Sequence, residues 1–463
     1  MNINRIMLSD SYKYSQPMQY PDNVVGMYDY LEARGGMYPE TIFYGLQYLL
    51  EEYLATPITI EEVIEAKDYA EAHGEPFNLE GWEYIVNVLG GRLPVRIKAV
   101  PEGMRVPTKL PLATIESTDD KVYWVVGFLE TLLMKVWYPT TVATKSYYVK
   151  QMLLEYAEKY SDSVDGVGFQ YHNFGDRGST TVEAAALGGS AHLTQFLGTD
   201  NFNATRFIDK YYGENSGIAG YSIPATEHST VTSWGKSREL DFYENYLETF
   251  KGSPIVACVM DSYDIYNATD KITSGEFKNK IESDEYPIFV LRPDSGDALE
   301  VVSKMLDIME KNKVKFTYNT KEYKVFNKYR IIYGDGISPD VIKSILDMCI
   351  GRGYAPDNLA FGSGGDLMQN VNRDTCKFAI KCSSVELQDG SRRDVFKDPI
   401  TDSGKMSKKG RVTTFIGKDG RLRVGTLDSE TLDGERELLN VIFENGALNR
   451  TYSFDKVRAN LEG

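Results

Sequence analysis

Three short apolar runs in the second half of the chain each end abruptly on polar or glycine residues, and this repeated pattern constrains the fold most strongly. The runs and their polar ends occupy residues 287–296, 329–336 and 358–366. A short apolar run that is bounded by turn residues and followed by a helical pattern is typical of a buried parallel strand. The polar residues then lie at the carboxyl end of each strand, where barrel enzymes carry their catalytic groups.

The same alternation of short apolar segments and helical patterns extends over the middle of the chain. A βα alternation predicts a parallel sheet. Polar residues follow nearly every strand, which favours a barrel over a doubly wound sheet with its single switch point. We therefore predict an irregular, TIM-like parallel βα barrel. Its strands are expected at 168–174, 190–197, 254–260, 287–291, 329–333 and 358–361, with helices at 298–311 and 338–350.

The two ends of the chain have a mixed α+β pattern instead. Strands are expected at 24–30 and 93–99, and a helical stretch over 121–160 should break or kink at Trp137-Tyr-Pro139. At 463 residues the chain exceeds one ordinary core. We predict a catalytic barrel over 151–380 and one discontinuous α+β domain built from 1–150 and 381–463. The first of these end segments should also hold helices at about 46–56, 59–73 and 80–90.

Composition excludes several classes of function. The net charge of −16 argues against nucleic acid as a partner, because Lys and Arg hold phosphate backbones. No apolar stretch is long enough to cross a bilayer, and the first ten residues lack a long apolar segment, so we expect a cytoplasmic protein with no membrane partner. The four scattered cysteines show no zinc-site spacing and are expected to be reduced thiols.

His228 is the best candidate nucleophile among the four histidines. It lies in the polar segment 222–230 and has no helical apolar face on which to pack. An imidazole can accept a phosphoryl group when one nitrogen is unprotonated and a carboxylate holds the other. Glu227 is adjacent but should point away, so we expect Asp264, from another strand end, to be that carboxylate. A structural histidine near a helix start is the alternative.

Two turns are suited to a flat, anionic ligand. The segment Phe174-Gly-Asp-Arg177 places an aromatic ring beside a guanidinium at a tight turn. The glycine-rich residues 362–365 follow a strand, so their backbone N–H groups can cradle one phosphate. Asp366 brings a negative charge near this phosphate unless its side chain turns away. Taken singly, the aromatic is more often a core residue, and one glycine-rich loop is a weak signal.

A basic segment over 373–411 can supply charges for a polyanionic ligand. It holds ten basic residues against six acidic ones, so its local net charge is +4 inside an acidic chain. The portion Gly404-Lys-Met-Ser-Lys-Lys-Gly410 is a candidate mobile loop that closes on pyrophosphate or nucleotide. A solvated run of charges is the alternative.

Taken together, short motifs along the chain resemble the nicotinamide phosphoribosyltransferases, a type II phosphoribosyltransferase family. The match runs in order through nearly the whole chain, and such an ordered set is hard to reach by chance. The motifs are Asp10-Ser-Tyr-Lys13, Ile42-Phe-Tyr-Gly-Leu-Gln47, Trp137-Tyr-Pro139, Phe174-Gly-Asp-Arg-Gly178, Gly198-Thr-Asp200, Glu227-His-Ser-Thr230, Asp261-Ser-Tyr-Asp264, Arg292-Pro-Asp-Ser-Gly296, Gly334-Asp-Gly336, Phe361-Gly-Ser-Gly-Gly365 and Tyr452-Ser-Phe-Asp455.

The resemblance implies transfer of a phosphoribosyl group from phosphoribosyl pyrophosphate to nicotinamide, giving nicotinamide mononucleotide and pyrophosphate in NAD salvage. It also implies Mg²⁺, whose ligands it does not identify, and ATP hydrolysis coupled through a phosphohistidine at His228. The active sites of such an enzyme lie at the interface of a homodimer.

The resemblance further implies a role for individual residues. The pyridine ring is expected between Phe174 and, from the other subunit, Tyr12, with Asp200 at the carboxamide. The remaining expected contacts are Arg177, Arg292 and Asp294 for pyrophosphate and ribose, Gly334 and Asp335 for the sugar, Gly364 and Gly365 for the mononucleotide phosphate, and Arg373, Lys381 and Lys397 as basic groups supplied across the interface.

Elementary chemistry agrees with these roles. Loss of pyrophosphate builds positive charge on the ribose, which Asp294 and Asp335 can stabilise while cations act on the leaving group. An ionised Asp200 accepts from the amide of nicotinamide but repels the carboxylate of nicotinate, so nicotinamide is the predicted substrate. Two alternatives are a nicotinate phosphoribosyltransferase, which would be indifferent to Asp200→Asn, and a non-catalytic binding protein on the same fold, which would turn over neither pyridine.

Overall fold

The fold is described from a computed structural model of the protein, over residues 3–213, 217–401, 407–429 and 431–461. The chain divides into two compact units. Unit 1 comprises Met1–Thr144, Ile208–Gly217 and Asn372–Gly463, and unit 2 comprises Lys145–Phe207 and Ile218–Val371. These boundaries differ from the predicted ones at 150 and 380, and the short segment Ile208–Gly217 was expected in the barrel.

Tyrosines explain why this short segment belongs to unit 1. Tyr212 stacks on Tyr44 with ring centroids 5.1 Å apart, and its hydroxyl donates to Oε2 of the buried Glu102 at 2.8 Å. Tyr211 packs edge-on against Tyr48 at 4.8 Å. Nothing in the local apolar pattern distinguishes these tyrosines from residues of a barrel helix.

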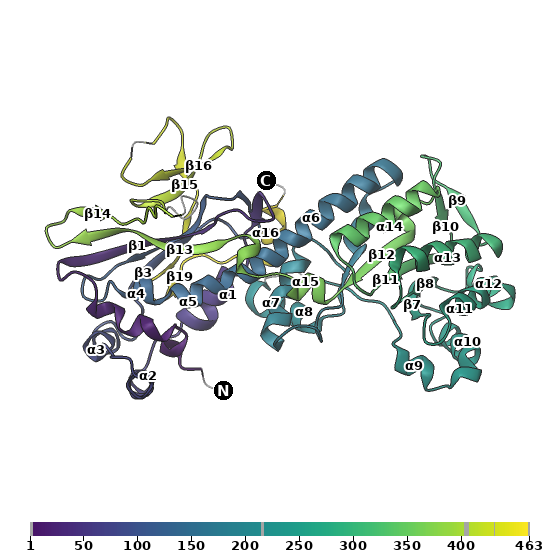
Figure 1. Ribbon diagram of the computed structural model, residues 1–463, viewed down its shortest axis with the longest axis horizontal. Coiled ribbons are helices and arrows are strands. Elements are labelled where there is room, and N and C mark those ends of the chain that lie inside the picture. Colours follow the sequence, from purple (N-terminus) through teal and green to yellow (C-terminus); the bar gives the residue numbers. More distant parts are fainter. Residues whose placement is uncertain (1–2, 214–216, 402–406, 430, 462–463) are drawn as a thin grey trace. The chain divides into compact units, whose positions relative to one another are not determined.

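Unit 2 is built on a curled parallel sheet of five strands in the order β6-β12-β11-β8-β7 (Figure 1). Isolated parallel bridges join Asn173 to Thr199, Gly198 to Tyr221 and Ala225 to Ala257, so short extended segments continue the sheet from both edges. The predicted parallel βα architecture is confirmed, but a complete TIM-like barrel is not, because these connections are single bridges. The strands are β6 (Tyr171–Asn173), β7 (Ile255–Val259), β8 (Ile288–Arg292), β11 (Tyr329–Tyr333) and β12 (Leu359–Ser363).

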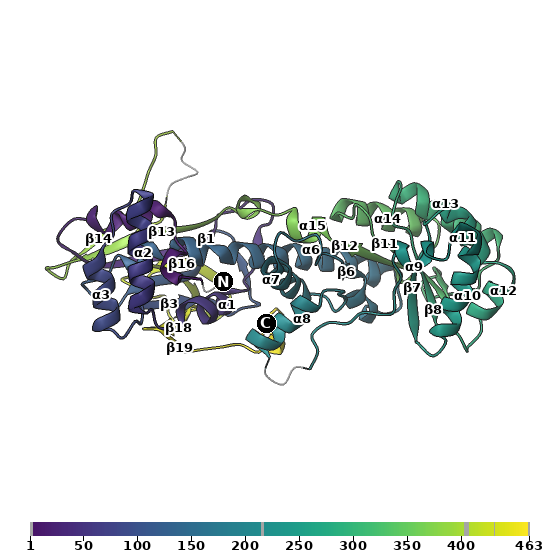
Figure 2. The same ribbon diagram turned by 90° about the horizontal axis from the view of Figure 1, so that it is seen from below.

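Helices alternate with these strands. Helix α13 (Ala298–Lys311) begins at the N-cap Asp297 and has the predicted bounds, and α14 (Pro339–Gly351) begins at the N-cap Ser338. Together with α11 (Ile265–Ile272) they run along one side of the sheet in Figure 2. The other elements are α7 (Val182–Leu193), α8 (Phe202–Tyr212), α9 (His228–Thr232), α10 (Glu239–Thr249), α12 (Gly275–Ile281), α15 (Gly365–Gln369) and the hairpin of β9 (Phe316–Tyr318) and β10 (Lys324–Phe326).

The strand predicted at 190–197 is wrong, because α7 occupies the first part of this segment. Thr181 caps the helix by accepting from Ala184 N at 3.0 Å, and every residue from Ala185 to Leu193 is buried. A helix that is buried on all sides lacks a polar face, so its apolar run cannot be distinguished from a buried strand by periodicity.

Unit 1 is built on a sheet of seven strands in the order β14-β13-β1-β5-β3-β18-β19. Strand β1 (Val24–Ala33) pairs antiparallel with β13 (Phe378–Leu387), from Val24 opposite Leu387 to Ala33 opposite Phe378. The two ends of the chain therefore share one sheet. Its other strands are β3 (Val95–Ala99), β5 (Pro111–Ser117), β14 (Arg392–Asp394), β18 (Asn440–Glu444) and β19 (Ala447–Leu448).

Smaller elements complete unit 1. Helix α2 (Ile60–His73) begins with a capping box formed by Thr59 and Glu62, and α3 (Leu79–Asn87) follows it. The remaining elements are α1 (Leu46–Leu49), α4 (Val125–Phe128), α5 (Glu130–Leu133), α16 (Phe454–Ala459), the pair β2 (Glu40–Ile42) and β4 (Arg105–Pro107), and the sheet of β15 (Val412–Ile416), β16 (Leu422–Thr426) and β17 (Arg436–Glu437).

The predicted break at Trp137-Tyr-Pro139 is the start of a long helix. Helix α6 spans Trp137–Tyr160 and follows a 3₁₀ turn at Met134–Val136. Pro139 lies in its first turn, where backbone N–H groups have no intrahelical acceptor and a missing one costs little.

Three other expectations concern composition and mobility. All four cysteines are free, and Cys258, Cys349 and Cys376 are buried. No helix within the described ranges has both the length and the apolar character to cross a membrane. The candidate loop 404–410 lies partly outside the described residues, because they exclude 402–406.

Candidate active site

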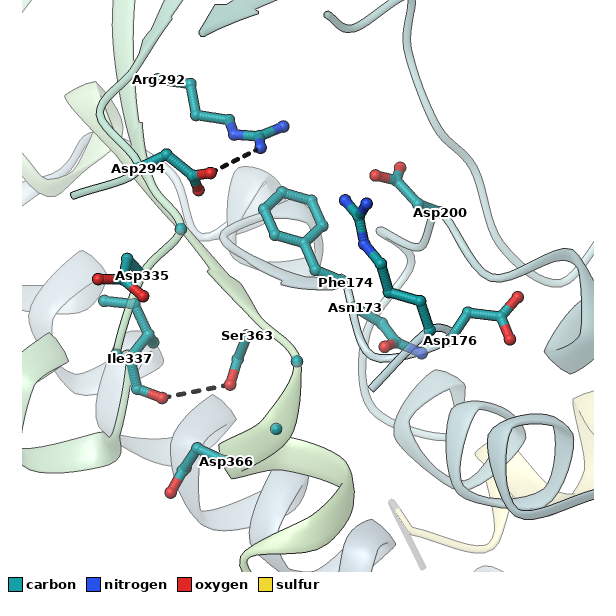
Figure 3. Close-up of a pocket in the computed structure, with 15 residues that line it drawn as sticks. Asn173, Phe174, Asp176, Asp200, Arg292, Asp294, Asp335, Ile337, Ser363 and Asp366 are labelled. Carbon is teal, nitrogen blue, oxygen red and sulfur yellow. Dashed lines mark hydrogen bonds and ion pairs between the residues drawn. The ribbon is translucent and has the colours of Figure 1, made fainter. Parts of the chain in front are cut away.

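A polar cavity of about 700 Å³ lies at the carboxyl ends of the parallel strands of unit 2 (Figure 3). It brings together all the predicted pyridine, sugar and phosphate contacts that belong to this unit. Phe174 and Arg177 follow β6, and Asp200 lies between α7 and α8. Arg292 and Asp294 lie at the end of β8. Gly334 and Asp335 follow β11, and Gly364 and Gly365 follow β12. The ligand roles of these residues remain predictions.

The ring of Phe174 lies against bare backbone of two neighbouring strand ends. A Cβ on Gly362 would lie only 1.8 Å from Phe174 Cε2, and one on Gly334 would lie 3.3 Å from the same atom. The guanidinium of Arg292 lies 5.3 Å from the ring centroid. Gly362 therefore makes room for the aromatic ring, a role that the sequence pattern of a phosphate loop did not suggest.

Asp200 is held in place by two donors. Its Oδ1 lies 2.8 Å from His172 Nε2 and accepts from Ser222 Oγ at 2.6 Å. Burial by itself would raise the pKa of Asp200, but the hydrogen bond and charge of His172 and the hydrogen bond of Ser222 outweigh it, so the pKa is lowered. The carboxylate is thus ionised at neutral pH.

Sequence reasoning missed both donors. His172 lies two residues before Phe174, at the end of a predicted strand, so strand alternation places it on the same face as the ring and could have identified it. Ser222 has no such signal, because a single bridge, not a strand, brings its neighbour Tyr221 to Gly198.

His228 begins the short helix α9 and pairs with Asp261, not with Asp264. Its Nε2 lies 3.0 Å from Asp261 Oδ1, and its Nδ1 lies 4.0 Å from Asp294 Oδ2. The prediction that Asp264 holds His228 is wrong. Asp264 caps α11 instead, where Oδ1 accepts from the backbone N–H groups of Tyr266 and Asn267 at 3.0 Å each.

Asp261 is well placed to orient other groups as well. Its side chain is only 5% exposed, and its Oδ2 accepts from the backbone N–H of Asp294 at 3.1 Å and from Ser295 Oγ at 2.5 Å. Asp294 in turn lies 3.3 Å from an Arg292 nitrogen, the contact drawn in Figure 3. One buried carboxylate therefore links His228 to the end of β8 and so to the cavity.

The predicted phosphate contacts Gly364 and Gly365 line one part of the cavity, here called its phosphate end, and Asp366 follows them in the cavity wall. A Cβ on Gly365 would meet no atom within 4 Å, so the space beside this residue is open. The carboxylate of Asp366 pairs with Lys145, a residue that sequence reasoning did not single out.

Four predicted site residues belong to unit 1. Tyr12 is 54% exposed, Arg373 and Lys397 are also exposed, and Lys381 is half-buried with its Nζ donating to Ile380 O at 2.8 Å. Burial lowers the pKa of Lys381, and the charges of Lys397 and Arg34 act in the same direction against that of Glu130. Their supply across a dimer interface remains a prediction.

The sequence matches the model of the nicotinate phosphoribosyltransferase (NAPRTase) family over residues 169–441, which include the cavity and both partners of His228. The chain belongs to this family. Residues 4–97 also match the model of the nicotinamide phosphoribosyltransferase N-terminal domain. The protein is therefore a phosphoribosyltransferase, as its resemblance to these enzymes predicted.

Two relatives of this phosphoribosyltransferase match over nearly their full length. A nicotinamide phosphoribosyltransferase of Xanthomonas campestris pv. campestris is 47% identical, with 99% of this chain and 98% of the relative covered. One of Acinetobacter baylyi is 30% identical over 99% of this chain and 97% of its own. Both relatives are thus similar to this chain over nearly all of its length.

Two solved structures share the fold of this phosphoribosyltransferase. A nicotinate-nucleotide pyrophosphorylase from Pyrococcus furiosus has a TM-score of 0.59 at 14% identity and covers 99% of this chain and 94% of its own. Human nicotinic acid phosphoribosyltransferase has the same TM-score and identity over 98% and 93%. At this identity the likeness concerns the fold alone.

Proposed function

We propose that this phosphoribosyltransferase transfers the phosphoribosyl group of phosphoribosyl pyrophosphate to nicotinamide, as a cytoplasmic homodimer in NAD salvage. The products are nicotinamide mononucleotide and pyrophosphate, and ATP hydrolysis is coupled to the transfer through phosphorylated His228. The single observation that carries the choice of substrate is the ionised Asp200 beside Phe174. The names of the 47% and 30% identical relatives support the same substrate.

Asp200 distinguishes the two pyridines by charge. Its carboxylate accepts from the amide N–H of nicotinamide, whereas it meets the carboxylate of nicotinate with like charge. His172 and Ser222 fix its position and keep it ionised. A site built around such a hydrogen bond discriminates by about 10⁴-fold against a ligand that cannot form it.

Stacking supplies the affinity that a flat, uncharged ring cannot gain from hydrogen bonds. Phe174 provides one face, seated on Gly362 and Gly334. Tyr12 of a second subunit provides the other face in this proposal, and its exposed side chain is available for that contact. By analogy with bases on aromatic side chains, each such stack contributes about 1–3 kcal/mol.

Carboxylates act on the ribose of the substrate, and cationic groups act on its leaving pyrophosphate. Asp294 and Asp335 stabilise the positive charge that develops on the ribose, and Arg177 and Arg292 hold the departing pyrophosphate. Mg²⁺ fits this set, because it takes oxygen ligands and is held by one or two carboxylates together with substrate phosphates. Asp294 and Asp335 would hold it, and bound Mg²⁺ would neutralise charge on the leaving group.

His228 stores the phosphoryl group in this proposal. With Nε2–H donating to Asp261, the second nitrogen, Nδ1, keeps its lone pair and is the atom that accepts phosphate. The buried Asp261 stabilises the charged phosphoimidazole. A His228→Ala variant should lose all coupling to ATP while slow, uncoupled transfer survives.

The proposal is tested by steady-state kinetics with phosphoribosyl pyrophosphate, Mg²⁺ and each pyridine, with and without ATP. We expect turnover of nicotinamide, and a loss of its preference over nicotinate by about 100-fold or more in Asp200→Asn. Asp176→Asn is the matched control, because Asp176 also lines the cavity but is bound by Asn203. If the enzyme prefers nicotinate and Asp200→Asn leaves that preference unchanged, the result would support a nicotinate phosphoribosyltransferase. If it turns over neither pyridine, the result would support a binding protein.

A further inference from the structure

The phosphate end of the cavity holds a carboxylate where an anion is expected to bind. Asp366 directly follows Gly364 and Gly365 in the cavity wall. The described lining carries five aspartates, Asp366 included, against two arginines, Arg177 and Arg292. A free carboxylate beside a phosphate would repel it. Some feature of the protein must therefore neutralise the negative charge of Asp366 if a phosphate is to bind there.

Lys145, on helix α6, neutralises this charge. Its Nζ lies 2.6 Å from Asp366 Oδ2 and donates to the backbone carbonyl of Asp366, also at 2.6 Å. The side chain of Lys145 is 6% exposed, so this ammonium has little access to water. Asn370 donates to the other carboxylate oxygen at 2.8 Å. The oxygens of Asp366 point away from Phe174 and Arg292 in Figure 3.

We propose that Lys145 is a positioning residue for phosphate recognition: it neutralises Asp366 and holds its carboxylate away from the backbone of Gly364 and Gly365. This inference rests on the proposed function, in which these glycines take the phosphate of the ribose. Lys145 itself is not among the residues that line the cavity. It acts by keeping an acidic side chain from facing a phosphate, and a buried, paired lysine is suited to this because it cannot turn to solvent.

The test compares three variants by steady-state kinetics with phosphoribosyl pyrophosphate and by calorimetric binding of nicotinamide mononucleotide. Lys145→Met leaves Asp366 unpaired, and we expect KM for phosphoribosyl pyrophosphate and Kd for the mononucleotide to rise about 10- to 100-fold. KM for nicotinamide and kcat should change by less than about threefold, because the pyridine end is untouched. Damage to the fold would instead lower kcat and melting temperature together.

The charge-free pair Lys145→Met/Asp366→Asn is the decisive variant. It should recover both constants to within about threefold of the wild type, since the repelling carboxylate is gone. Asp366→Asn alone should not weaken phosphate binding, and it tests the inference even if Lys145→Met does not fold. A tenfold weakening in Asp366→Asn, or no recovery in the double variant, would overturn the inference.

These outcomes separate the inference from the proposed function. If the wild type transfers phosphoribosyl to nicotinamide while Lys145→Met keeps wild-type constants for phosphate ligands, the inference alone fails. If the wild type shows neither turnover of nicotinamide nor binding of its mononucleotide, the proposed function fails and the inference fails with it.

Discussion

At the scale of single residues, the choice between two aspartates three positions apart decides how His228 is held. Both follow β7 and both are competent carboxylates. Asp261 reaches the imidazole, whereas Asp264 satisfies two N–H groups at the start of α11. The difference lies in where the helix begins, and an aspartate at that point is used by the backbone.

Asp261→Asn and Asp264→Asn form a matched pair for testing this assignment. We expect Asp261→Asn to lower ATP-coupled turnover by about 10²-fold or more, because an amide no longer fixes the tautomer or stabilises a charged imidazole. Asp264→Asn should keep its coupling, since asparagine also caps helices well. The measurement is ATP hydrolysed per mononucleotide formed, and equal losses in the two variants would contradict the assignment.

A second residue with an unusual environment is Asp29 on β1. It is 3% exposed and lies opposite Cys382 on β13. Burial, reinforced by the charge of Glu130, raises its pKa to about 7 against a hydrogen bond from Cys382 and the charges of Lys13 and Lys381. The folded protein therefore holds this proton at a pH where the unfolded chain has lost it.

This pKa predicts a specific dependence of stability on pH. Near pH 4 the Asp29 carboxyl is protonated in the folded state, so its burial lowers the free energy of unfolding very little. As pH rises towards 7 the unfolded state ionises first, which lowers the free energy of unfolding by up to about 4 kcal/mol. Asp29→Asn should therefore raise stability at pH 8 by about 1–3 kcal/mol and much less near pH 4.5.

Denaturant unfolding of Asp29→Asn at several pH values checks this. Asp22→Asn, an exposed aspartate in the turn before β1, is the control and should show no such trend. A stability gain that is the same at pH 4.5 and pH 8 would mean that ionisation of Asp29 is not its cause.

At the scale of elements, β12 and the turn after it perform two separate tasks. Gly362 lies inside the strand and leaves room for Phe174, whereas Gly365 lies beyond it, beside open space. A single glycine-rich run therefore makes room for the aromatic ring at one end and, in the proposed function, takes the phosphate at the other.

Alanine at each position should separate the two tasks. Gly362→Ala places a Cβ within 1.8 Å of the ring, so Phe174 must move, and we expect KM for nicotinamide to rise about tenfold or more with a stability loss of about 1–3 kcal/mol. Gly365→Ala should instead raise KM for phosphoribosyl pyrophosphate. Kinetics with each substrate varied in turn distinguishes them, and an unchanged nicotinamide KM in Gly362→Ala would contradict the role of that glycine.

Strands and helices were predictable from sequence where their ends carry chemical signals. The strands that stop on polar residues were located to within a few positions, and α13 has the bounds that its helical pattern predicted. Helix α7 was missed, because a segment buried on all sides shows no alternation between apolar and polar faces. The partners of His228 and Asp200 were missed for a related reason, since contacts between strand ends are not encoded in local pattern.

At the scale of the whole molecule, the acidic cavity and the basic segment belong to different units. The cavity of unit 2 has three more aspartates than arginines, although its proposed substrate is a polyanion. The basic segment 373–411, including Lys381 and Lys397, belongs to unit 1. A homodimer in which unit 1 of one subunit completes the site of the other would reconcile the two.

Mixed dimers test this arrangement directly. His228→Ala alters unit 2 and Lys381→Ala alters unit 1, so a dimer with one chain of each has one intact site if Lys381 acts across the interface. After joint refolding of equal amounts, about a quarter of wild-type ATP-coupled activity should return. His228→Ala mixed with Arg292→Ala is the control and should recover nothing. Equal failure of both mixtures would show that Lys381 acts within its own subunit.

The sequence by itself determined the parallel βα core of unit 2, the pairing of both chain ends in one α+β unit, the membership in a phosphoribosyltransferase family and the set of strand-end residues. These follow from local signals: runs of apolar residues, caps, turns and short ordered motifs. Only the tertiary structure decided that Asp261 holds His228, that His172 and Ser222 hold Asp200, and that Lys145 pairs with Asp366. Each of these pairs joins residues more than 20 positions apart. Such contacts depend on how strand ends converge in space, and no local pattern of residues specifies that convergence.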